Sequence, residues 1–408
     1  MHKLPSISID YFLNPAFRRQ EPYGDQRASI LNAGALARAE QEIIAWPGYQ
    51  VTPQHSLGDL ADALGVASIH YKDEGSRFGL GSFKALGGAY AVGRLLCREL
   101  GLRLGRDLNP SDLLQSELRQ ACTDITVTCA TDGNHGRSVA WGAQLFGCRC
   151  VIYIHASVSD GRKQAIERFA AQVVRTGGNY DDAVRQADRD AQANGRHVIS
   201  DTSYPGYMDV PRDVMQGYQL MVQEAVQQLD AWPTHVFVQA GVGGLAAAVC
   251  AYFWERDAQR RPFFTVVEPT RADCLLQSAR NARLTAVTGK LDTLMAGLAC
   301  GEVSLLAWEI LERGANAFCT VDDDAAVAVM QLLARPPGQD AAIVAGESAV
   351  AGLAAAIGIA CDPDARAAFG IDAESRILFF GSEADTDPAL YQQLVGASAA
   401  DILDGTAA

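Results

Sequence analysis

Short apolar, β-branched runs alternate with helical stretches along most of the chain from about residue 123 onward. Several runs are followed at once by Gly, Asn or Asp, after which apolar residues recur with helical spacing. A repeated order of strand, polar turn and helix is typical of a parallel α/β architecture. The predicted strands are TDITVTCA (123–130), CVIYI (150–154), QVVRT (172–176), RHVIS (196–200), HVFVQ (235–239), FTVV (264–267) and RILFF (376–380).

Length and charge narrow the class of protein. A chain of 408 residues is long for one core, so we expect two subdomains. The net charge of −14 opposes binding to nucleic acid or to anionic membrane surfaces. No segment reaches the ~20 consecutive apolar residues of a spanning helix. Residues 1–15 also lack the apolar run of a signal peptide, so we expect a cytoplasmic protein.

Ten cysteines raise the question of a metal site or of disulfides. None lie in CxxC pairs, and Cys148 and Cys150 have no His or Cys cluster nearby, so we expect no metal site. We interpret the cysteines as buried thiols that act as small apolar groups. Cys274 and Cys300, which flank a polar stretch, are the pair to check for an accidental or regulatory disulfide.

A lysine follows a glycine-rich loop in the segment GLGSFKALGG (79–88). This residue, Lys84, lies between Phe83 and Ala85 and opens an apolar helix. Partial burial there would lower the pKa of the amine and make it nucleophilic. Taken alone, the same position equally fits a lysine whose stem lies along a helix start with its charge in water.

Two further glycine-containing turns follow predicted strands. The turn ATDGNHG (130–136) offers a carboxylate, an amide and an imidazole, although a polar turn with a left-handed Asn would look similar. The turn QAGVGGL (239–245) offers successive backbone N–H groups at a helix start, which suits a phosphate. It is neither a GxGxxG dinucleotide fingerprint nor a Walker motif. Its glycines could also serve only close packing of helix on sheet.

Together the three segments supply an amine for an aldehyde, a side chain for a ring oxygen and a cradle for a phosphate. These are the groups that pyridoxal 5'-phosphate (PLP) requires. In a parallel sheet, ligands bind at the carboxyl ends of the strands, where these glycine turns lie. We therefore interpret the chain as a PLP enzyme.

Longer segments narrow this interpretation. The chain resembles the fold-type II PLP enzymes, the tryptophan synthase β-like class, and within it the diaminopropionate ammonia-lyases. Threonine dehydratases and cysteine synthases would share the lysine and the glycine turns, but not ATDGNHG, MAGLACGE and a GSExDTDP motif together. The matching segments are FGLGSFKALGGAYAV (78–92), ATDGNHGRSVAW (130–141), SDTSYPGY…MQGY (200–218), VEPTRADC (267–274), MAGLACGE (295–302) with Trp308, GESAVAGL (346–353) and GSEADTDP (381–388).

The resemblance implies roles for individual residues. Lys84 would hold PLP as a Schiff base and take the α-proton from the L-isomer of the substrate, and Asp132 would take it from the D-isomer. Asp201 is similar to a family position near the distal amino group. Asn134 would bind the ring hydroxyl, and Ser382 would face the pyridine nitrogen. The phosphate would lie on Gly241, Val242, Gly243 and Gly244.

The resemblance also implies a fold and an activity. The fold would have two open, twisted, mostly parallel sheets flanked by helices. A large domain (1–93 and 213–408) and a small domain (94–212) would hold PLP between them. The reaction would be α,β-elimination of D- or L-2,3-diaminopropionate to pyruvate and two ammonia molecules. The implied partners are this small amino acid and a second copy of the chain, in a homodimer.

Two departures from the family and three rival functions stay open. Ala384 stands where the family usually has glycine, and SDTSYPGY (200–207) replaces a more usual DTAWEGY. The nearest rival is a serine or threonine dehydratase, or a β-replacement enzyme, of the same fold. A catalytically silent PLP- or metabolite-binding protein is disfavoured by the joint presence of Lys84, Asp132 and Asn134. A nucleotide-binding module would need an acidic ribose partner after a GxGxxG turn.

Overall fold

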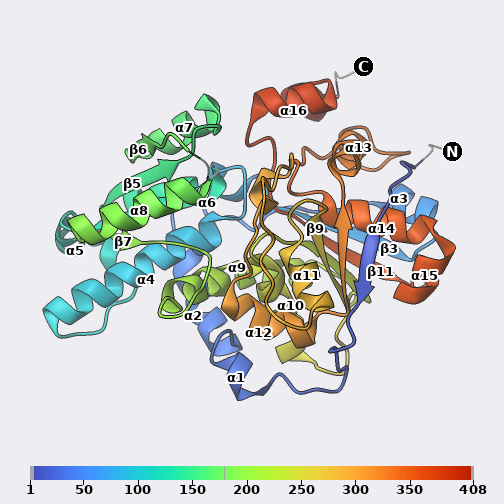
Figure 1. The fold of residues 1–408 in the computed structure, drawn as a ribbon, viewed down its shortest axis with the longest axis horizontal. Coiled ribbons are helices and arrows are strands. Elements are labelled where there is room, and N and C mark those ends of the chain that lie inside the picture. The colour runs from blue at the N-terminus through green and yellow to red at the C-terminus, as the bar shows by residue number, and fades with distance from the viewer. Residues whose placement is uncertain (1–3, 132, 179, 406–408) are drawn as a thin grey trace. The chain divides into compact units, whose positions relative to one another are not determined.

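The computed structural model of the chain describes residues 4–131, 133–178 and 180–405. Contacts between Cα atoms divide the chain into two compact units, which Figure 1 shows as a ribbon. The first unit comprises Met1–Asn32, Val51–Ser76 and Val222–Ala408, and the second comprises Ala33–Gln50 and Arg77–Met221. Each unit is built around its own sheet.

Among the described residues, the sheet of the first unit has seven strands in the order β1-β10-β9-β8-β11-β3-β2. All neighbouring strands from β10 to β3 are parallel, whereas the edge strands β1 and β2 are antiparallel to their neighbours. The carboxyl ends of the parallel strands therefore meet at one edge of the sheet. The strands are β1 (Asp10–Leu13), β2 (Gln54–Ser56), β3 (Ser68–Asp73), β8 (His235–Gln239), β9 (Phe263–Pro269), β10 (Ala317–Val321) and β11 (Arg376–Gly381).

Helices cover both faces of this sheet, with α3, α14 and α15 on one face and α10, α11 and α12 on the other (Figure 1). The central helices α10 and α14 are buried over nearly their whole length. They are rich in Ala and Gly because a helix enclosed on all sides needs small apolar residues in every direction. The helices of the unit are α1 (Gly24–Ala28), α3 (Gly58–Leu64), α10 (Gly244–Arg256), α11 (Cys274–Arg280), α12 (Leu305–Gly314), α13 (Asp323–Ala334), α14 (Ala351–Cys361), α15 (Pro363–Phe369), α16 (Pro388–Val395), α17 (Ala399–Leu403) and the 3-10 turn Ala296–Leu298.

The sheet of the second unit has, within the described ranges, four parallel strands in the order β6-β5-β4-β7. The chain moves outward from β4 to β6 and then crosses back to β7. Right-handed crossovers therefore place α8 on the face opposite α6 and α7. The strands are β4 (Thr126–Ala130), β5 (Arg149–Ile154), β6 (Gln172–Arg175) and β7 (His197–Val198).

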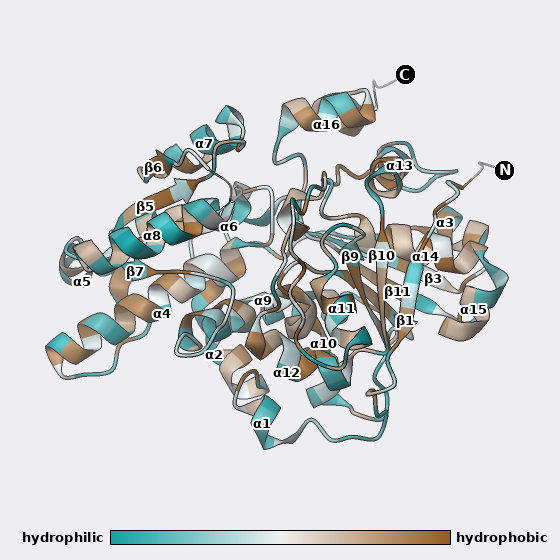
Figure 2. Ribbon diagram, in the orientation of Figure 1, coloured by the Kyte–Doolittle hydropathy of each residue, from teal (hydrophilic) through white to brown (hydrophobic). Residues whose placement is uncertain are grey.

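The helices of the second unit include the long helix α4, which packs closely on α6. In Figure 2, α8 turns a largely hydrophilic side to the viewer, whereas strands β9 and β10 of the first unit are hydrophobic. The helices are α2 (Ala33–Ile43), α4 (Ala85–Leu104), α5 (Ser116–Cys122), α6 (Asn134–Phe146), α7 (Asp160–Glu167), α8 (Tyr180–Asn194), the 3-10 turns Arg77–Gly79 and Asp112–Leu114, and α9 (Asp209–Gln227), whose last residues belong to the first unit.

Glycines let the start of α4 approach its neighbours closely. A methyl group added to Gly88 would overlap the hydroxyl of Ser138 on α6. One added to Gly217 on α9 would overlap the carbonyl oxygen of Leu86. The glycines of the KALGG and MQGY segments thus serve helix packing directly behind Lys84.

A substitution at this contact should destabilise the fold. Replacing Gly217 by Ala is expected to lower the free energy of unfolding by ~1–3 kcal/mol, because a backbone carbonyl cannot move aside. The matched control is Gly161→Ala in α7, where the nearest atom lies 3.9 Å from the added carbon and Ala should be neutral or stabilising by up to ~1 kcal/mol. Denaturant unfolding of both variants measures this, and equal shifts would contradict it.

The sequence-based prediction of the fold class is confirmed, since both sheets are mostly parallel and flanked by helices. Each predicted apolar run overlaps a strand, with bounds that differ by up to three residues. Strands β1, β2, β3 and β10 were not among the predictions. In the described part of the chain, no helix has both the length and the apolar composition needed to cross a membrane.

Candidate active site

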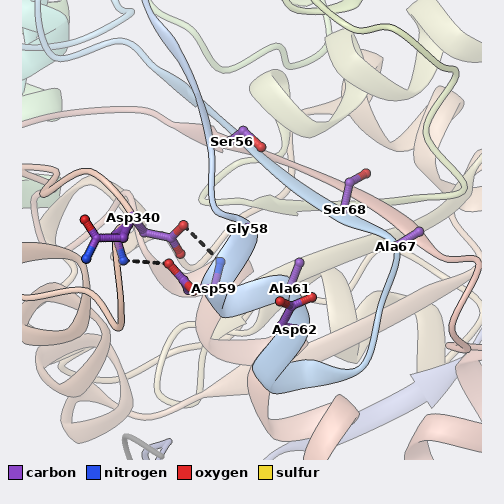
Figure 3. A pocket seen from close by; sticks show the side chains of 9 residues that line it. Ser56, Gly58, Asp59, Ala61, Asp62, Ala67, Ser68 and Asp340 are labelled. Carbon is purple, nitrogen blue, oxygen red and sulfur yellow. Dashed lines mark hydrogen bonds between the residues drawn. The ribbon is translucent and has the colours of Figure 1, made fainter.

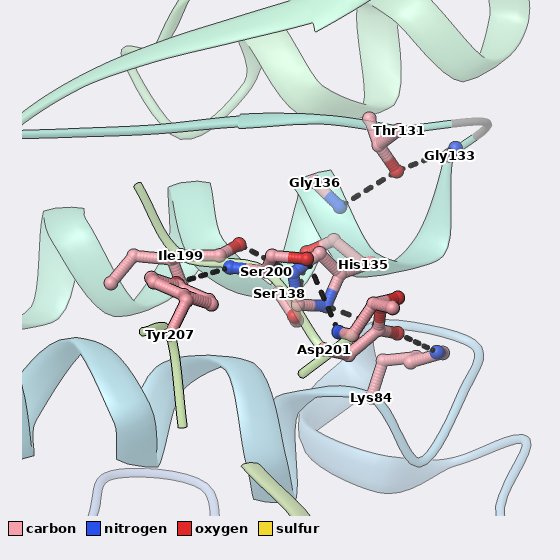
Figure 4. Close-up of polar contacts among 11 residues, drawn as sticks. Lys84, Thr131, Gly133, His135, Gly136, Ser138, Ile199, Ser200, Asp201 and Tyr207 are labelled. Carbon is pink, nitrogen blue, oxygen red and sulfur yellow. Dashed lines mark hydrogen bonds and ion pairs between the residues drawn. The ribbon is translucent and has the colours of Figure 1, made fainter. Parts of the chain in front are cut away.

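Lys84 immediately precedes α4 and directs its amine at a carboxylate. Its Nζ lies 2.9 Å from Oδ2 of Asp201, and the two side chains are 20% and 21% exposed (Figure 4). The same Nζ lies 5.5 Å from the ring centre of Phe83 and 5.9 Å from that of Tyr218. A lysine stem lying along the surface would not be enclosed in this way, so the structure favours the reading of Lys84 as a site residue.

Asp201 is held rigidly by the segment that precedes it. The N–H of Ile199 donates to the carbonyl of Thr128 at 2.8 Å. The hydroxyl of Tyr207 accepts from the N–H of Ser200 at 3.0 Å and donates to the carbonyl of Val198 at 2.7 Å. Because β4 and β7 are parallel neighbours, their carboxyl ends bring Asp201 beside the ATDGNHG turn.

The electrostatics of Asp201 favour the carboxylate. Burial raises its pKa, but the ammonium of Lys84, which also donates a hydrogen bond to the carboxylate, lowers it. The pKa of Asp201 therefore lies well below its ordinary value. A charged carboxylate here can bind and orient an amine.

The ATDGNHG turn joins β4 to α6. The hydroxyl oxygen of Thr131 accepts from the N–H groups of Gly133 and Gly136, both at 3.0 Å, and so closes the turn (Figure 4). Oδ1 of Asn134 accepts from Nη2 of Arg137 at 2.7 Å, which makes Nδ2 the donating side of the amide. Such a donor suits the oxygen of a ring hydroxyl. The remaining predicted residue of this turn, Asp132, lies outside the described residues.

The GVGG turn lies between β8 and the 13-residue helix α10. The backbone N–H groups of Gly241, Val242 and Gly243 have no acceptor among the described residues. Gly243 has a φ of 98°, which favours glycine, and a carbon added to Gly241 would lie 2.9 Å from Sγ of Cys300. Unpaired N–H groups at the start of a helix fit a phosphate.

Ser382 follows β11 and is buried. Its Oγ accepts from Nε2 of Gln239 at 2.8 Å, and the same Nε2 donates to the carbonyl of Phe380 at 2.7 Å. The parallel pairing of β8 with β11 brings Gln239 and Ser382 together. Since the oxygen accepts from Gln239, the hydroxyl proton can be donated to a ring nitrogen.

The whole chain is similar to known PLP enzymes. A family model described as "Pyridoxal-phosphate dependent enzyme" matches residues 45–381. The diaminopropionate ammonia-lyase of Salmonella typhimurium is 38% identical over 409 residues, covering 97% of this chain and 98% of its own. The holo crystal structure of the Escherichia coli diaminopropionate ammonia lyase aligns with a TM-score of 0.86 at 35% identity. Its complex with D-serine gives 0.86 at 34%, and both cover 96% of this chain and 98% of theirs.

The chain belongs to the diaminopropionate ammonia-lyase family of PLP-dependent enzymes. The cofactor of the family is PLP. The groups described above fit it, because they include an enclosed amine, unpaired N–H groups at a helix start and an oriented hydroxyl.

The two departures from the family pattern are accommodated locally. Gly75 makes room for Ala384, because a carbon added to Gly75 would lie 2.8 Å from the Ala384 methyl. In the SDTSYPGY segment the rings of Tyr204 and Tyr207 stack with centres 5.0 Å apart. The second tyrosine is the one that fixes the backbone before Asp201, so this segment still positions that carboxylate.

Other candidate residues have structural roles. Lys72 is fully buried and pairs with Glu224 at 3.0 Å, so its amine is not presented to a ligand. Cys274 and Cys300 are not joined by a disulfide. No group of three or more metal-ligating side chains occurs among the residues that the structure describes.

A surface cavity of about 390 Å³ lies at the start of α3 (Figure 3). Two of its three carboxylates accept hydrogen bonds from backbone N–H groups. Asp340 accepts from the N–H groups of Asp59 and Leu60 at 3.0 and 2.9 Å, and Asp59 accepts from that of Gln339 at 2.6 Å. These hydrogen bonds hold the loop that contains Asp340 against the start of α3. We therefore assign no separate chemistry to the cavity.

Sequence reasoning missed three positioning residues. His135 was noted only as an imidazole on the turn, and Gln239 and Tyr207 were given no role. His135 contacts the Asp201 segment, Gln239 orients Ser382, and Tyr207 fixes the strand end before Asp201. His135 and Tyr207 lie in matching segments, which was a signal, and Gln239 precedes the GVGG turn. The partners of His135 and Gln239 come from other strands.

Proposed function

We propose that the chain catalyses α,β-elimination of 2,3-diaminopropionate, in both its D and L forms, to pyruvate and two ammonia molecules. The observation that carries this proposal is the amine of Lys84, held 2.9 Å from Asp201 in a family member aligned over nearly its full length. When bound, PLP withdraws electrons from the α-carbon of an amino acid and makes its proton removable. The residues of the chain supply the other requirements.

The proposed cofactor ligands are Lys84, Asn134, Ser382 and the GVGG turn. Lys84 would attach covalently through its amine. The Nδ2 of Asn134 would donate to the ring hydroxyl, and the Ser382 hydroxyl to the pyridine nitrogen. The phosphate ligands would be the backbone N–H groups of Gly241, Val242, Gly243 and Gly244. A neutral hydroxyl at the ring nitrogen does not enforce full protonation of the ring, which suits elimination.

The proposed acid–base groups are Lys84, Asp132 and Asp201. Lys84 would remove the α-proton of the L-isomer and Asp132 that of the D-isomer. Asp201, whose pKa is held low, would bind the distal ammonium of the substrate as a carboxylate. This arrangement would favour a substrate with an amino group rather than a hydroxyl at its β-carbon.

Keto-acid release tests the function directly. D- and L-2,3-diaminopropionate, L-serine, D-serine and L-threonine are compared side by side at matched concentrations with the PLP-loaded chain. We expect both diaminopropionate isomers to be the best substrates and to release two ammonia molecules per pyruvate. Faster turnover of serine or threonine would instead identify a dehydratase of the same fold.

We further propose a homodimer in the cytoplasm, with the chain divided into a large domain (1–93 and 213–408) and a small domain (94–212). Free cysteines support a reducing compartment, because thiols persist there. The family resemblance supports the dimer and the division. Light scattering of the purified protein and limited proteolysis test these two points.

A further inference from the structure

His135 places a ring nitrogen beside the carboxylate that holds Lys84. Its Nδ1 lies 3.9 Å from Oδ2 of Asp201, the oxygen that Nζ of Lys84 approaches to 2.9 Å (Figure 4). Two titratable groups, the amine of Lys84 and the imidazole of His135, thus face the same oxygen of a third, Asp201. The imidazole is nearly enclosed, with a side chain only 10% exposed.

The tautomer of His135 follows from its second nitrogen. Nε2 lies 2.8 Å from the carbonyl oxygen of Ile199. A carbonyl can only accept, so Nε2 carries a proton in both the neutral and the charged ring. In the neutral ring Nδ1 therefore carries a lone pair and no proton. It is buried, has no hydrogen-bond partner within the described ranges, and faces the carboxylate at a distance too long for a hydrogen bond.

A buried lone pair facing a carboxylate is unfavourable until a proton is placed on it. Burial lowers the pKa of His135, the carboxylate of Asp201 raises it, and the ammonium of Lys84 lowers it again. The neutral ring is thus favoured while Lys84 is charged. When Lys84 loses its charge, one of the effects that lower the pKa of His135 disappears. The carboxylate of Asp201 then still raises that pKa.

Within the described ranges, three other titratable groups act on these residues, and all three are neutral near pH 7. Cys129 on β4, Tyr207 after β7 and Tyr218 on α9 all have pKa values raised mainly by burial. Within the described part of the chain, the charged groups that act on His135 are Asp201 and Lys84. The histidine therefore responds to these two neighbours.

We propose that His135 is a positioning residue that takes up, through Asp201, the proton that Lys84 must lose before its amine can react. The proton leaves Nζ of Lys84, crosses Oδ2 of Asp201 and arrives at Nδ1 of His135. The net charge of the three groups is zero before and after, because an ammonium is exchanged for an imidazolium beside the same carboxylate. This inference rests on the proposed function in that Lys84 is taken as the reactive amine.

The transfer leaves Asp201 ionised both before and after the proton has moved. If no second group accepted the proton of Lys84, there would be two outcomes. The buried carboxylate of Asp201 would lack a neighbouring cation, or it would keep the proton itself. An imidazolium at Nδ1 can donate to Oδ2 after a small shift of either side chain. Asp201 then remains available to bind the distal ammonium of a substrate.

Histidine NMR of the full chain tests the proton acceptor without any turnover. The chain carries seven histidines, and with ¹³Cε1-labelled histidine the His135 signal is assigned from its loss in His135→Gln. We expect Lys84→Met, which removes the ammonium, to raise the pKa of His135 by ~1 unit or more, whereas Lys84→Arg keeps it near that of the wild type. An equal His135 pKa in Lys84→Met and Lys84→Arg overturns the inference, as does a neutral ring protonated at Nδ1.

His235 is the internal control for this titration. It is also buried and also bonds a carbonyl through Nε2, that of Phe369 at 3.0 Å, but its Nδ1 meets the hydroxyl of Thr234. Its signal should be the same in both Lys84 variants. A parallel shift of His235 would indicate a general change of fold and would count against the specific coupling.

The rate of covalent loading with PLP tests the consequence for Lys84. The amide of a glutamine can still donate to Ile199 but cannot accept a proton at the Nδ1 position. We expect His135→Gln to slow loading by ~10–10²-fold below neutral pH, with a smaller effect at high pH. His235→Gln, the matched control, should load like the wild type.

Equal pH profiles for His135→Gln and the wild type would refute the inference. If His135→Gln does not fold, Asp201→Asn assigns the His135 signal by its shift, and the comparison of the two Lys84 variants stands by itself. Failure of the proposed function would appear separately, as a lack of pyruvate from diaminopropionate with the His135 titration intact.

Discussion

Replacing Lys84 by alanine is expected to abolish covalent attachment of PLP and to lower turnover of both diaminopropionate isomers by at least ~10³-fold. The side chain is proposed both as the nucleophile that holds the cofactor and as a base, and alanine offers neither group. Pyruvate release and the absorbance of the bound cofactor measure the two effects. Added amines should restore little of the rate, because the enclosed position beside Asp201 is specific to a tethered amine.

The matched control is Lys163→Ala in the same unit. Lys163 pairs with Glu167 at 2.8 Å on the surface of α7, and its side chain is 32% exposed. Its removal should leave cofactor content and turnover unchanged. Borohydride reduction and peptide mapping of the wild type should place the pyridoxyl group on Lys84. A label on Lys72, Lys163 or Lys290 would disprove the assignment.

Replacing Asp132 by asparagine is expected to lower turnover of D-diaminopropionate by ~10²–10⁴-fold, the usual contribution of a positioned general base. Turnover of the L-isomer should fall much less, because Lys84 would remain as its base. The prediction comes from the ATDGNHG motif, in which Asp132 stands two residues before Asn134. Initial rates with each isomer, measured on the same PLP-saturated preparation, give the comparison.

An alternative role for Asp132 predicts a different pattern. An Asp in a tight turn often braces the turn by accepting from nearby backbone N–H groups. Loss of that brace would lower the rates with both isomers together, along with PLP affinity or thermal stability. Equal losses for the two isomers would therefore exclude a separate base for each face, even in an active ammonia-lyase.

Much of the fold was predictable because its signals are local. The run HVFVQ (235–239) has an apolar centre and leads into a glycine turn, and it is β8 residue for residue. The edge strands β1 and β2 have only four and three residues and no buried residue, so they carry no comparable pattern. Their pairing with β10 and β3 is decided by neighbours far away in the chain.

The candidate site likewise combines segments that can be recognised locally with contacts between residues far apart in the chain. Lys84, the ATDGNHG turn and the GVGG turn could be singled out because each is a short segment with its own chemistry. The contact of Lys84 with Asp201, 117 positions later, could not be derived from either segment. The same holds for Gln239, whose amide would pass for an ordinary strand end without its contact with Ser382, 143 positions away.

The sequence by itself singled out the segments proposed to carry chemistry and placed the ATDGNHG and GVGG turns at the ends of strands, because apolar periodicity and glycine turns are properties of neighbouring residues. Only the tertiary structure decided which of these groups meet. The parallel pairing of β4 with β7 brings His135 to Asp201, and that of β8 with β11 brings Gln239 to Ser382. The physical reason is that strand order depends on how whole sheets and helices pack. Strand order in turn sets the surroundings of each candidate residue, and these surroundings set its protonation.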